Sequence, residues 1–153
     1  MSIDKARVHL AKVGLADRII ELEDSSATVA LAAQALGCDP DHIAKTLSFE
    51  NGEGAVLILA AGMARIDNPK FKAQFGMKAK MLPAEKVESI IGHSVGGVCP
   101  FGVNEGIEVY LDASLQKYEI VYPAAGNDHS GVRLTVDELF AASGALGFVD
   151  VCK

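Results

Sequence analysis

The sequence predicts a mixed α/β fold, on three observations. The chain of 153 residues is 50% hydrophobic but only 6% aromatic and contains no Trp, so its core must be built mainly from aliphatic side chains. Segments with apolar residues at helical spacing are intermixed with short segments that alternate or are wholly apolar. Several connections are of hairpin length, which favours a mixed sheet over a regular parallel one. We therefore expect helices that flank a mixed, partly antiparallel central sheet.

One domain over residues 1–153 is the simplest organisation. A chain of this length buries about 68–70% of the surface that it exposes when unfolded, which is enough for a core without disulfide bonds or structural metal ions. The sequence has no Pro-, Gly- or Ser-rich linker, no internal repeat and no low-complexity stretch. We therefore expect no domain boundary.

Five helices are predicted from apolar spacing and from end signals. Ser25 and Ser26 offer N-cap side chains for the second helix, and Gly37 ends it. Residues Thr135 to Glu138 form a capping box for the fifth. The helices are expected near residues 3–14, 27–37, 67–76, 83–92 and 135–140.

Six strands are predicted near residues 19–22, 43–50, 55–60, 107–111, 118–122 and 148–151. The strand at 55–60 is apolar on both faces, which places it at the centre of the sheet. Residues 51–54 (Asn-Gly-Glu-Gly) form the turn into it. Asp112 caps a short turn between the fourth and fifth strands.

Composition limits the function classes. A net charge of −6 argues against a broad electrostatic surface for nucleic acid, so any contact with RNA should be local and weak. The three cysteines are far apart and have no His at ligand spacing, which indicates neither a disulfide framework nor a metal site. The longest apolar run, 55–61, is far shorter than the roughly 20 residues of a membrane helix. We expect a cytoplasmic protein without a metal or a membrane anchor.

Lys45 is the strongest candidate for a functional residue. Strand side chains alternate between faces, so Lys45 shares a face with Ile43, Leu47 and Phe49, where an unpaired lysine is rare. A buried, functional ammonium is one interpretation. A strand end where the ammonium reaches water, or a bulge that turns it outward, is the other.

The second candidate is the loop 96–102 (Gly-Gly-Val-Cys-Pro-Phe-Gly). Adjacent glycines let backbone N–H groups approach an oxyanion or a phosphate, and Pro100 stiffens the turn. A tight connection between a helix and a strand explains the loop equally simply. It matches neither the Walker nor the dinucleotide pattern, so no cofactor is predicted. Cys99 has no histidine near it in sequence, and we expect it to shape the loop rather than to act as a nucleophile.

The third candidate is the polar loop 127–131. His129 and Ser130 are hydrogen-bonding side chains there, although a solvated turn explains the loop at least as well. The other histidines, His9, His42 and His93, fall at predicted surface or helix-end positions and are given no role.

Four features together resemble the YbaK family, which includes the editing domain inserted in bacterial prolyl-tRNA synthetases. They are the segment 25–28 (Ser-Ser-Ala-Thr) before an Ala-rich helix, the strand 42–47 (His-Ile-Ala-Lys-Thr-Leu), the loop 96–102 and the Gly-containing stretch before residues 132–134 (Val-Arg-Leu). The similarity runs from about residue 20 to the end. The resemblance implies a barrel-like sheet and an activity that strips wrongly attached amino acids from tRNA. The implied partners are the aminoacylated tRNA acceptor end and, as helpers, a prolyl-tRNA synthetase or an elongation factor.

Carried over by residue, the resemblance makes Lys45, Gly96 and Gly97 catalytic. Lys45 would hold the substrate, the loop amides would stabilise the developing oxyanion, and a water would attack, with neither metal nor cofactor. Substrate-binding roles fall to the residues around them: Thr46, Val98, Cys99, Pro100, His129 and Ser130. Some branches of the family have Asn after the lysine where this chain has Thr46.

Two alternatives remain on the sequence alone. The same pocket would suit a non-catalytic module that binds an aminoacylated end or docks to a synthetase, or a hydrolase for another small acyl ester. Within the editing hypothesis, alanine, cysteine, serine and threonine are all open as the amino acid removed.

Overall fold

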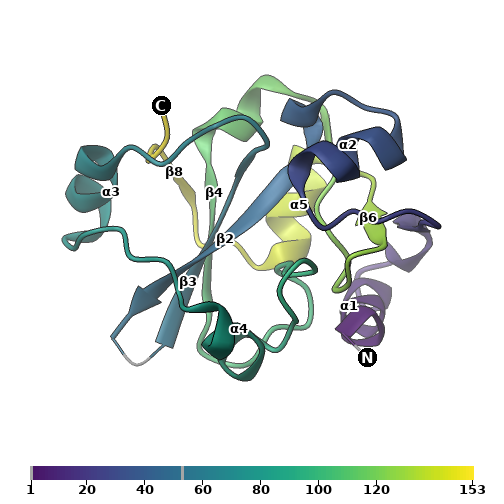
Figure 1. Cartoon of the computed structure of the whole chain (residues 1–153), viewed down its shortest axis with the longest axis horizontal. Coiled ribbons are helices and arrows are strands. Elements are labelled where there is room, and N and C mark those ends of the chain that lie inside the picture. Colours follow the sequence, from purple (N-terminus) through teal and green to yellow (C-terminus); the bar gives the residue numbers. More distant parts are fainter. Residues whose placement is uncertain (1, 53) are drawn as a thin grey trace.

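The computed structural model describes residues 2–52 and 54–153; the predicted turn at 51–54 includes residue 53, which lies outside them. The central sheet has the strand order β2-β3-β4-β8, and Figure 1 shows it crossing the middle of the molecule. The strands are β2 (Ala44–Asn51), β3 (Gly54–Ala61), β4 (Glu108–Asp112) and β8 (Phe148–Val149). β2 is antiparallel to β3, whereas β4 and β8 are parallel to their neighbours. The mixed, partly antiparallel sheet is confirmed, and in the described residues it is not closed into a barrel.

Two small antiparallel sheets accompany the main one. In the first, β1 (Ile19–Glu21) pairs with β6 (Ser130–Val132). In the second, β5 (Ile120–Val121) pairs with β7 (Leu134–Thr135). Both sheets join segments that are separated along the chain and carry no mutual signal in the sequence, so these pairings were not predicted.

The five predicted helices are present, and Figure 1 shows α3 on one side of the sheet and α1, α2 and α5 on the other. They are α1 (Ser2–Ala11), α2 (Val29–Leu36), α3 (Asn68–Phe75), α4 (Ala84–Ile91) and α5 (Val136–Ser143). Three short 3-10 helices are also present: η1 (Ala16–Arg18), η2 (Pro40–His42) and η3 (Ala113–Lys117). The capping box that begins α5 is formed as predicted, with Thr135 and Glu138 bonded reciprocally.

Two local predictions are wrong. Thr28, and not Ser25 or Ser26, caps α2, because its hydroxyl accepts the Leu31 N–H at 3.2 Å. Asp112 is a cap, as predicted, because its carboxylate accepts the Ser114 N–H, but the element that it begins is the 3-10 helix η3 and not a short turn. The predicted strand at 118–122 is therefore reduced to the two residues of β5, and that at 148–151 to the two of β8.

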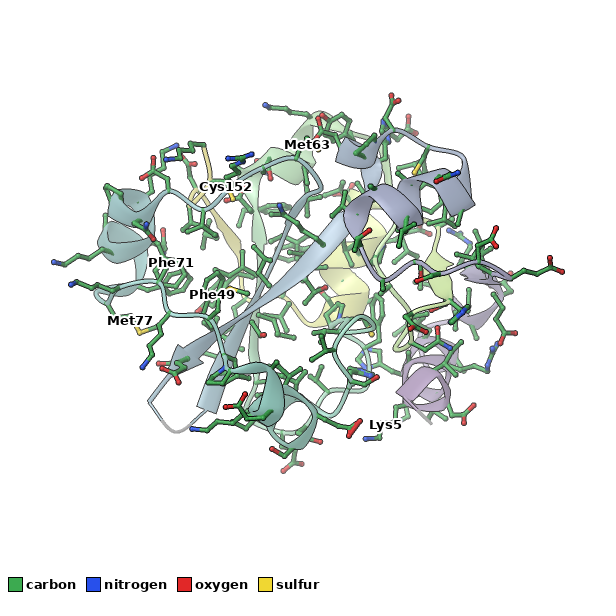
Figure 2. The ribbon with its side chains drawn as sticks, viewed as in Figure 1. Lys5, Phe49, Met63, Phe71, Met77 and Cys152 are labelled. Atoms are coloured by element: carbon green, nitrogen blue, oxygen red, sulfur yellow. The ribbon has the colours of Figure 1, made fainter. Side chains whose placement is uncertain are left out.

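The core has a layer on each face of β3, whose residues 55–61 are almost completely buried. This confirms the central place predicted for that strand. On one face lies a small aromatic layer: Phe49 of β2 and Phe71 of α3 have ring centroids 4.9 Å apart, and Figure 2 shows the two side chains close together. The opposite face is covered by α1, α4 and α5. No helix in the described residues is both long and apolar enough to cross a membrane.

Candidate active site

A cavity of about 330 Å³ lies along the outer edge of β2. It is enclosed by the start of α2, by α4 and the residues just before it, and by the loop that contains Gly96. Its lining is mainly apolar and includes Val29, Leu36, Leu82, Val87 and Val98. Such a cavity suits a small ligand that makes a few directed polar contacts.

Lys45 stands at this cavity, on the face of β2 that also carries Leu47 and Phe49. Its ammonium donates hydrogen bonds to the carbonyls of Gly62, at 3.1 Å, and Ala64. Burial lowers the pKa of Lys45 below its ordinary value, because the charged form loses hydration. An ammonium has three N–H donors, so two are used by the protein and one is left for a ligand.

The opposite face of β2 presents Ala44, Thr46 and Ser48 to the cavity. The Thr46 hydroxyl is buried, and no described group hydrogen-bonds to it. Nor does the Ser48 hydroxyl have a partner within the described chain. Ser48 was not among the predicted site residues, although the alternation of Ala44, Thr46 and Ser48 along the strand is the signal that places it here.

The glycine loop contributes two of its residues to the cavity wall, Gly96 and Val98. Gly96 has φ of +92°, a conformation that favours glycine. The amides of Gly96 and Val98 make no hydrogen bond to the described residues. Because both residues line the cavity, their amides are candidate donors for a ligand.

Gly97 lies in the same loop but not in the cavity lining. Its N–H donates to the Ser94 carbonyl at 3.1 Å, so this amide is already used. A Cβ at this position would lie 2.5 Å from the backbone of Asn127, which shows why only glycine fits. Gly97 therefore allows two loops to pack closely.

Cys99 and Pro100 were predicted to bind substrate, but neither lines the cavity. The Cys99 side chain is fully buried on the far side of the loop, with its Sγ 3.6 Å from Nε2 of His93. Burial raises the pKa of Cys99 to about 12. His93 was predicted at a surface or helix-end position. It does follow α4, but it is fully buried, and its Nε2 donates to the Phe101 carbonyl at 2.6 Å.

Ser130 and His129 lie apart although they are neighbours. Ser130 is in the cavity wall, but its hydroxyl accepts the Ala125 N–H at 3.3 Å and its N–H donates to the Ser26 hydroxyl at 3.0 Å. This pairing of Ser26 with Ser130 fixes the loop and was not predicted. His129 is exposed, with Nδ1 2.5 Å from the Asp128 carboxylate, and does not line the cavity.

The structure therefore gathers five of the nine predicted site residues around one cavity and leaves four outside its lining. Those at the cavity are Lys45, Thr46, Gly96, Val98 and Ser130. Those outside its lining are Gly97, Cys99, Pro100 and His129. No three His, Cys, Asp or Glu side chains in the described ranges are grouped to hold a metal ion. A mixed α/β fold with a half-buried lysine and unpaired loop amides around a small apolar cavity defines a protein that can bind a small acyl group.

Comparison with known proteins identifies the class more closely. The chain belongs to the aminoacyl-tRNA editing domain family, whose profile matches residues 23–142. It is 44% identical to the uncharacterized protein YwhH of Bacillus subtilis strain 168, over 100% of this chain and 98% of that protein. It is also 30% identical to a proline–tRNA ligase of Bacillus cytotoxicus, over 71% of this chain but only 18% of the ligase.

Solved structures agree on the fold. A protein described as a proposed trans-editing enzyme for prolyl-tRNA synthetase superposes with a TM-score of 0.89 at 33% identity, over 99% of this chain and 97% of that one. The hypothetical protein APE2540 superposes with a TM-score of 0.79 at 28% identity, over 89% and 91% of the two chains. The editing-domain fold is thus shared along nearly the whole chain.

Proposed function

We propose that this protein is a free-standing editing enzyme that hydrolyses the ester bond of mischarged aminoacyl-tRNA. The observation that carries the proposal is that Lys45 and the loop residues Gly96 and Val98, from distant parts of a chain of the editing-domain family, line one small apolar cavity. We propose that residues 1–153 act as one domain in the cytoplasm, where charged tRNA is made. A prolyl-tRNA synthetase or an elongation factor would deliver the acceptor end.

Lys45 is proposed to hold the reacting end of the substrate. Two of its N–H groups are anchored on Gly62 and Ala64, which fixes the direction of the third. That third donor would bind the aminoacyl carbonyl or the phosphate of the terminal nucleotide. In an apolar cavity the interaction is stronger than in water.

The amides of Gly96 and Val98 are proposed to stabilise the charge that develops on the carbonyl oxygen. A water molecule adds to the ester carbon and forms a new C–O bond. The bond from that carbon to the ribose oxygen then breaks, and the proton of the water passes to the departing oxygen, with the free ribose hydroxyl as the relay. The products are a free amino acid and deacylated tRNA, and neither a metal nor a cofactor enters this scheme.

The tRNA contact is proposed to lie along residues 65–80. This segment holds five of the 14 Lys and Arg residues but a single acid, Asp67, whereas the rest of the chain has nine cations against 19 acids. Its cations are Arg65, Lys70, Lys72, Lys78 and Lys80, all exposed. The segment begins next to the carbonyls that anchor Lys45 and ends next to Leu82 in the cavity wall. A local basic strip of this kind is how an acidic protein contacts phosphates.

The test of the activity is deacylation of tRNA-Pro charged with Ala, Cys, Ser or Thr, with Pro-tRNA-Pro as the control. We expect the protein to cleave at least one mischarged species and to spare the cognate one. A hydroxyl-bearing side chain suits the unpaired hydroxyls of Thr46 and Ser48, so Ser and Thr belong in the panel beside Ala and Cys. If no species is cleaved above the spontaneous rate, the editing proposal is wrong and the binding module takes its place.

The test of the tRNA contact is the salt dependence of binding to deacylated tRNA. Changing Lys72 and Lys78 to Glu should weaken binding and reduce the slope of log K against log salt by about 0.7–0.9 for each phosphate that the protein no longer neutralises.

The matched control changes Lys12 and Arg133 to Glu, which gives the same change in net charge. Lys12 directly follows α1, and the Arg133 N–H donates to the Arg18 carbonyl of η1. Figure 1 shows α1 and α3 on opposite sides of the molecule. Equal slopes for the two pairs of changes would show that residues 65–80 are not the tRNA contact.

A further inference from the structure

The outer edge of β2 is paired at two points and open between them. At one end the Ala44 N–H donates to the Tyr122 carbonyl at 3.0 Å. At the other, the Leu82 N–H donates to the Ser48 carbonyl at 3.0 Å. Two different segments of the chain therefore close the edge of the sheet, one before and one after Thr46, and both belong to the wall of the cavity.

The opening between them runs from the Ala44 carbonyl to the Ser48 N–H, with Thr46 at its centre. In an antiparallel ladder, alternate residues direct both their N–H and C=O to the same side. Because the Ala44 N–H and the Ser48 C=O are bonded on the outer side, the N–H and C=O of Thr46 point outward too, into the cavity that Thr46 lines. No group in the described part of the chain pairs with the Thr46 N–H or C=O. The buried Thr46 hydroxyl is unpaired as well.

Unpaired backbone groups in an apolar cavity are costly unless a ligand satisfies them. One amino-acid residue offers one donor and one acceptor in the spacing that a strand residue requires. An amino acid esterified to RNA does the same, with its α-ammonium as donor and its ester carbonyl as acceptor.

We propose that the aminoacyl group of the substrate binds to Thr46 as a one-residue extension of the β-sheet. The α-ammonium donates to the Thr46 carbonyl, and the ester carbonyl accepts from the Thr46 N–H. This places the ester in the cavity that Lys45, Gly96 and Val98 line. The inference rests on the proposed function and adds to it how the substrate is held: through the free amino group and the carbonyl of the amino acid, by the backbone of Thr46.

N-acylation removes the positive charge from the amino group. The charge-assisted hydrogen bond to the Thr46 carbonyl is then replaced by an ordinary one, which is weaker. N-acylated and peptidyl groups should therefore be cleaved less well than the free amino acid.

The experiment compares three acyl groups on one tRNA: the best amino acid of the panel, its N-acetyl derivative, and the 2-hydroxy acid with the same side chain. We expect kcat/KM to fall about 100-fold on N-acetylation and about 10-fold with the hydroxy acid, since the charge-assisted bond is lost in both and bulk is added in the first. Equal cleavage of the free and N-acetylated groups overturns the inference but leaves the editing function intact. If the amino acid itself is not cleaved, the proposed function fails, and the inference with it.

A pair of variants tests the backbone contact directly. Thr46→Pro removes the N–H at an edge position where it makes no ladder bond, whereas Thr46→Val removes the hydroxyl and keeps the N–H. The proline variant should lose about 10-fold more kcat/KM than the valine variant, with both melting cooperatively. Equal losses overturn the role of the N–H. Should the proline variant fail to fold, the comparison of acyl groups still decides.

Discussion

The glycine loop and the outer edge of β2 meet at the same cavity, but their polar groups are arranged in opposite ways. The loop is held from behind: His93 donates to the Phe101 carbonyl at 2.6 Å, and the Gly102 N–H donates to His9 at 3.0 Å. The edge of β2 leaves the backbone and the hydroxyl of Thr46 unpaired toward the cavity. One wall is thus fixed by redundant contacts, and the other keeps groups available.

The difference indicates which wall binds the substrate and which wall holds catalytic groups in position. Native structures pair nearly all buried polar groups, so an unpaired group that also lines the cavity, as the Thr46 hydroxyl does, points to a ligand. By that criterion β2 is the binding wall. The loop presents only the amides of Gly96 and Val98, and their position depends on side chains that never touch the cavity, such as His93 and Cys99. Substitutions on the β2 wall should therefore lower activity first, and substitutions on the loop wall should lower stability first.

The largest effect is expected on the β2 side. Lys45→Ala should lower kcat by about 10²- to 10³-fold, because it removes a donor that is aimed at the reacting group in an apolar cavity. Stability should change little by comparison, which a thermal melt checks. The control is Lys12→Ala, an exposed lysine directly after α1 that does not line the cavity. A Lys45→Ala enzyme that works at the wild-type rate would contradict the assignment of β2 as the catalytic wall.

The pH profile separates the charge of Lys45 from its shape. Burial lowers the pKa of Lys45, so its ammonium is lost at a lower pH than that of an exposed lysine. We expect kcat/KM for the 2-hydroxy acid ester, which has no ammonium of its own, to fall on the alkaline side as that proton is lost, after correction for spontaneous ester hydrolysis. A profile that stays flat up to the ordinary lysine pKa near 10.5 would show that the charge is not used.

On the loop side, the expected loss is first of all in stability. Gly97→Ala places a Cβ 2.5 Å from the backbone of Asn127, so one loop must move. The cost should be about 1–3 kcal/mol, measured by denaturant unfolding, with a fall in kcat as the amides of Gly96 and Val98 shift. Gly147→Ala is the matched control, because no atom lies within 4 Å of its added Cβ. If the two variants are equally stable, the loop is not held as tightly as its contacts indicate.

His93 makes the stability of the loop side depend on pH. Its Nε2 donates to a carbonyl, and its Nδ1 is buried without a partner among the described residues, so a second proton has no acceptor. Burial accordingly lowers the pKa of His93 below 6.5. As pH falls through about 6.5, the unfolded chain takes up a proton that the folded one refuses, so stability is full above this pH and declines below it, by at most ~1.4 kcal/mol per pH unit.

His93→Gln keeps an N–H donor for the Phe101 carbonyl but does not titrate, so its unfolding free energy should decline less steeply on acidification than that of the wild type. Urea unfolding at a series of pH values measures both slopes. His129→Gln, which changes an exposed histidine and leaves His93 in place, is the matched control. Identical slopes for the wild type and His93→Gln would mean that another group causes the acid sensitivity.

The contrast between the two walls also explains what the sequence could predict. The alternation along β2 was enough to predict the face of Lys45, and the wholly apolar segment at 55–60 to place β3 at the centre, because both signals are local and periodic. The loop has no period. No local sequence pattern shows that the Cys99 side chain turns away from the cavity or that the loop buries His93, because both depend on how residues 92–102 cross α1. The gap at Thr46 depends on two distant partners, Tyr122 and Leu82, and needs the structure.

The smallest effect on catalysis is expected at Cys99, because its thiol should take no part in the reaction. Its thiol is fully buried with a pKa of about 12, so at neutral pH it is neither ionised nor accessible, although an imidazole lies 3.6 Å away. Cys152 is buried too, with a pKa of about 12, whereas Cys38 is half-buried. A thiol reagent should therefore modify one cysteine of the folded protein, and Cys38→Ser should abolish that reaction.

Cys99→Ala should keep kcat within the order of magnitude of the wild type, with a fall in stability of about 1 kcal/mol because the side chain no longer fills its place in the core. Single-turnover deacylation and urea unfolding measure the two quantities on the same preparation. A large fall in kcat in a Cys99→Ala protein of near-native stability would instead place the thiol in the reaction, and the loop would no longer be the wall that only positions.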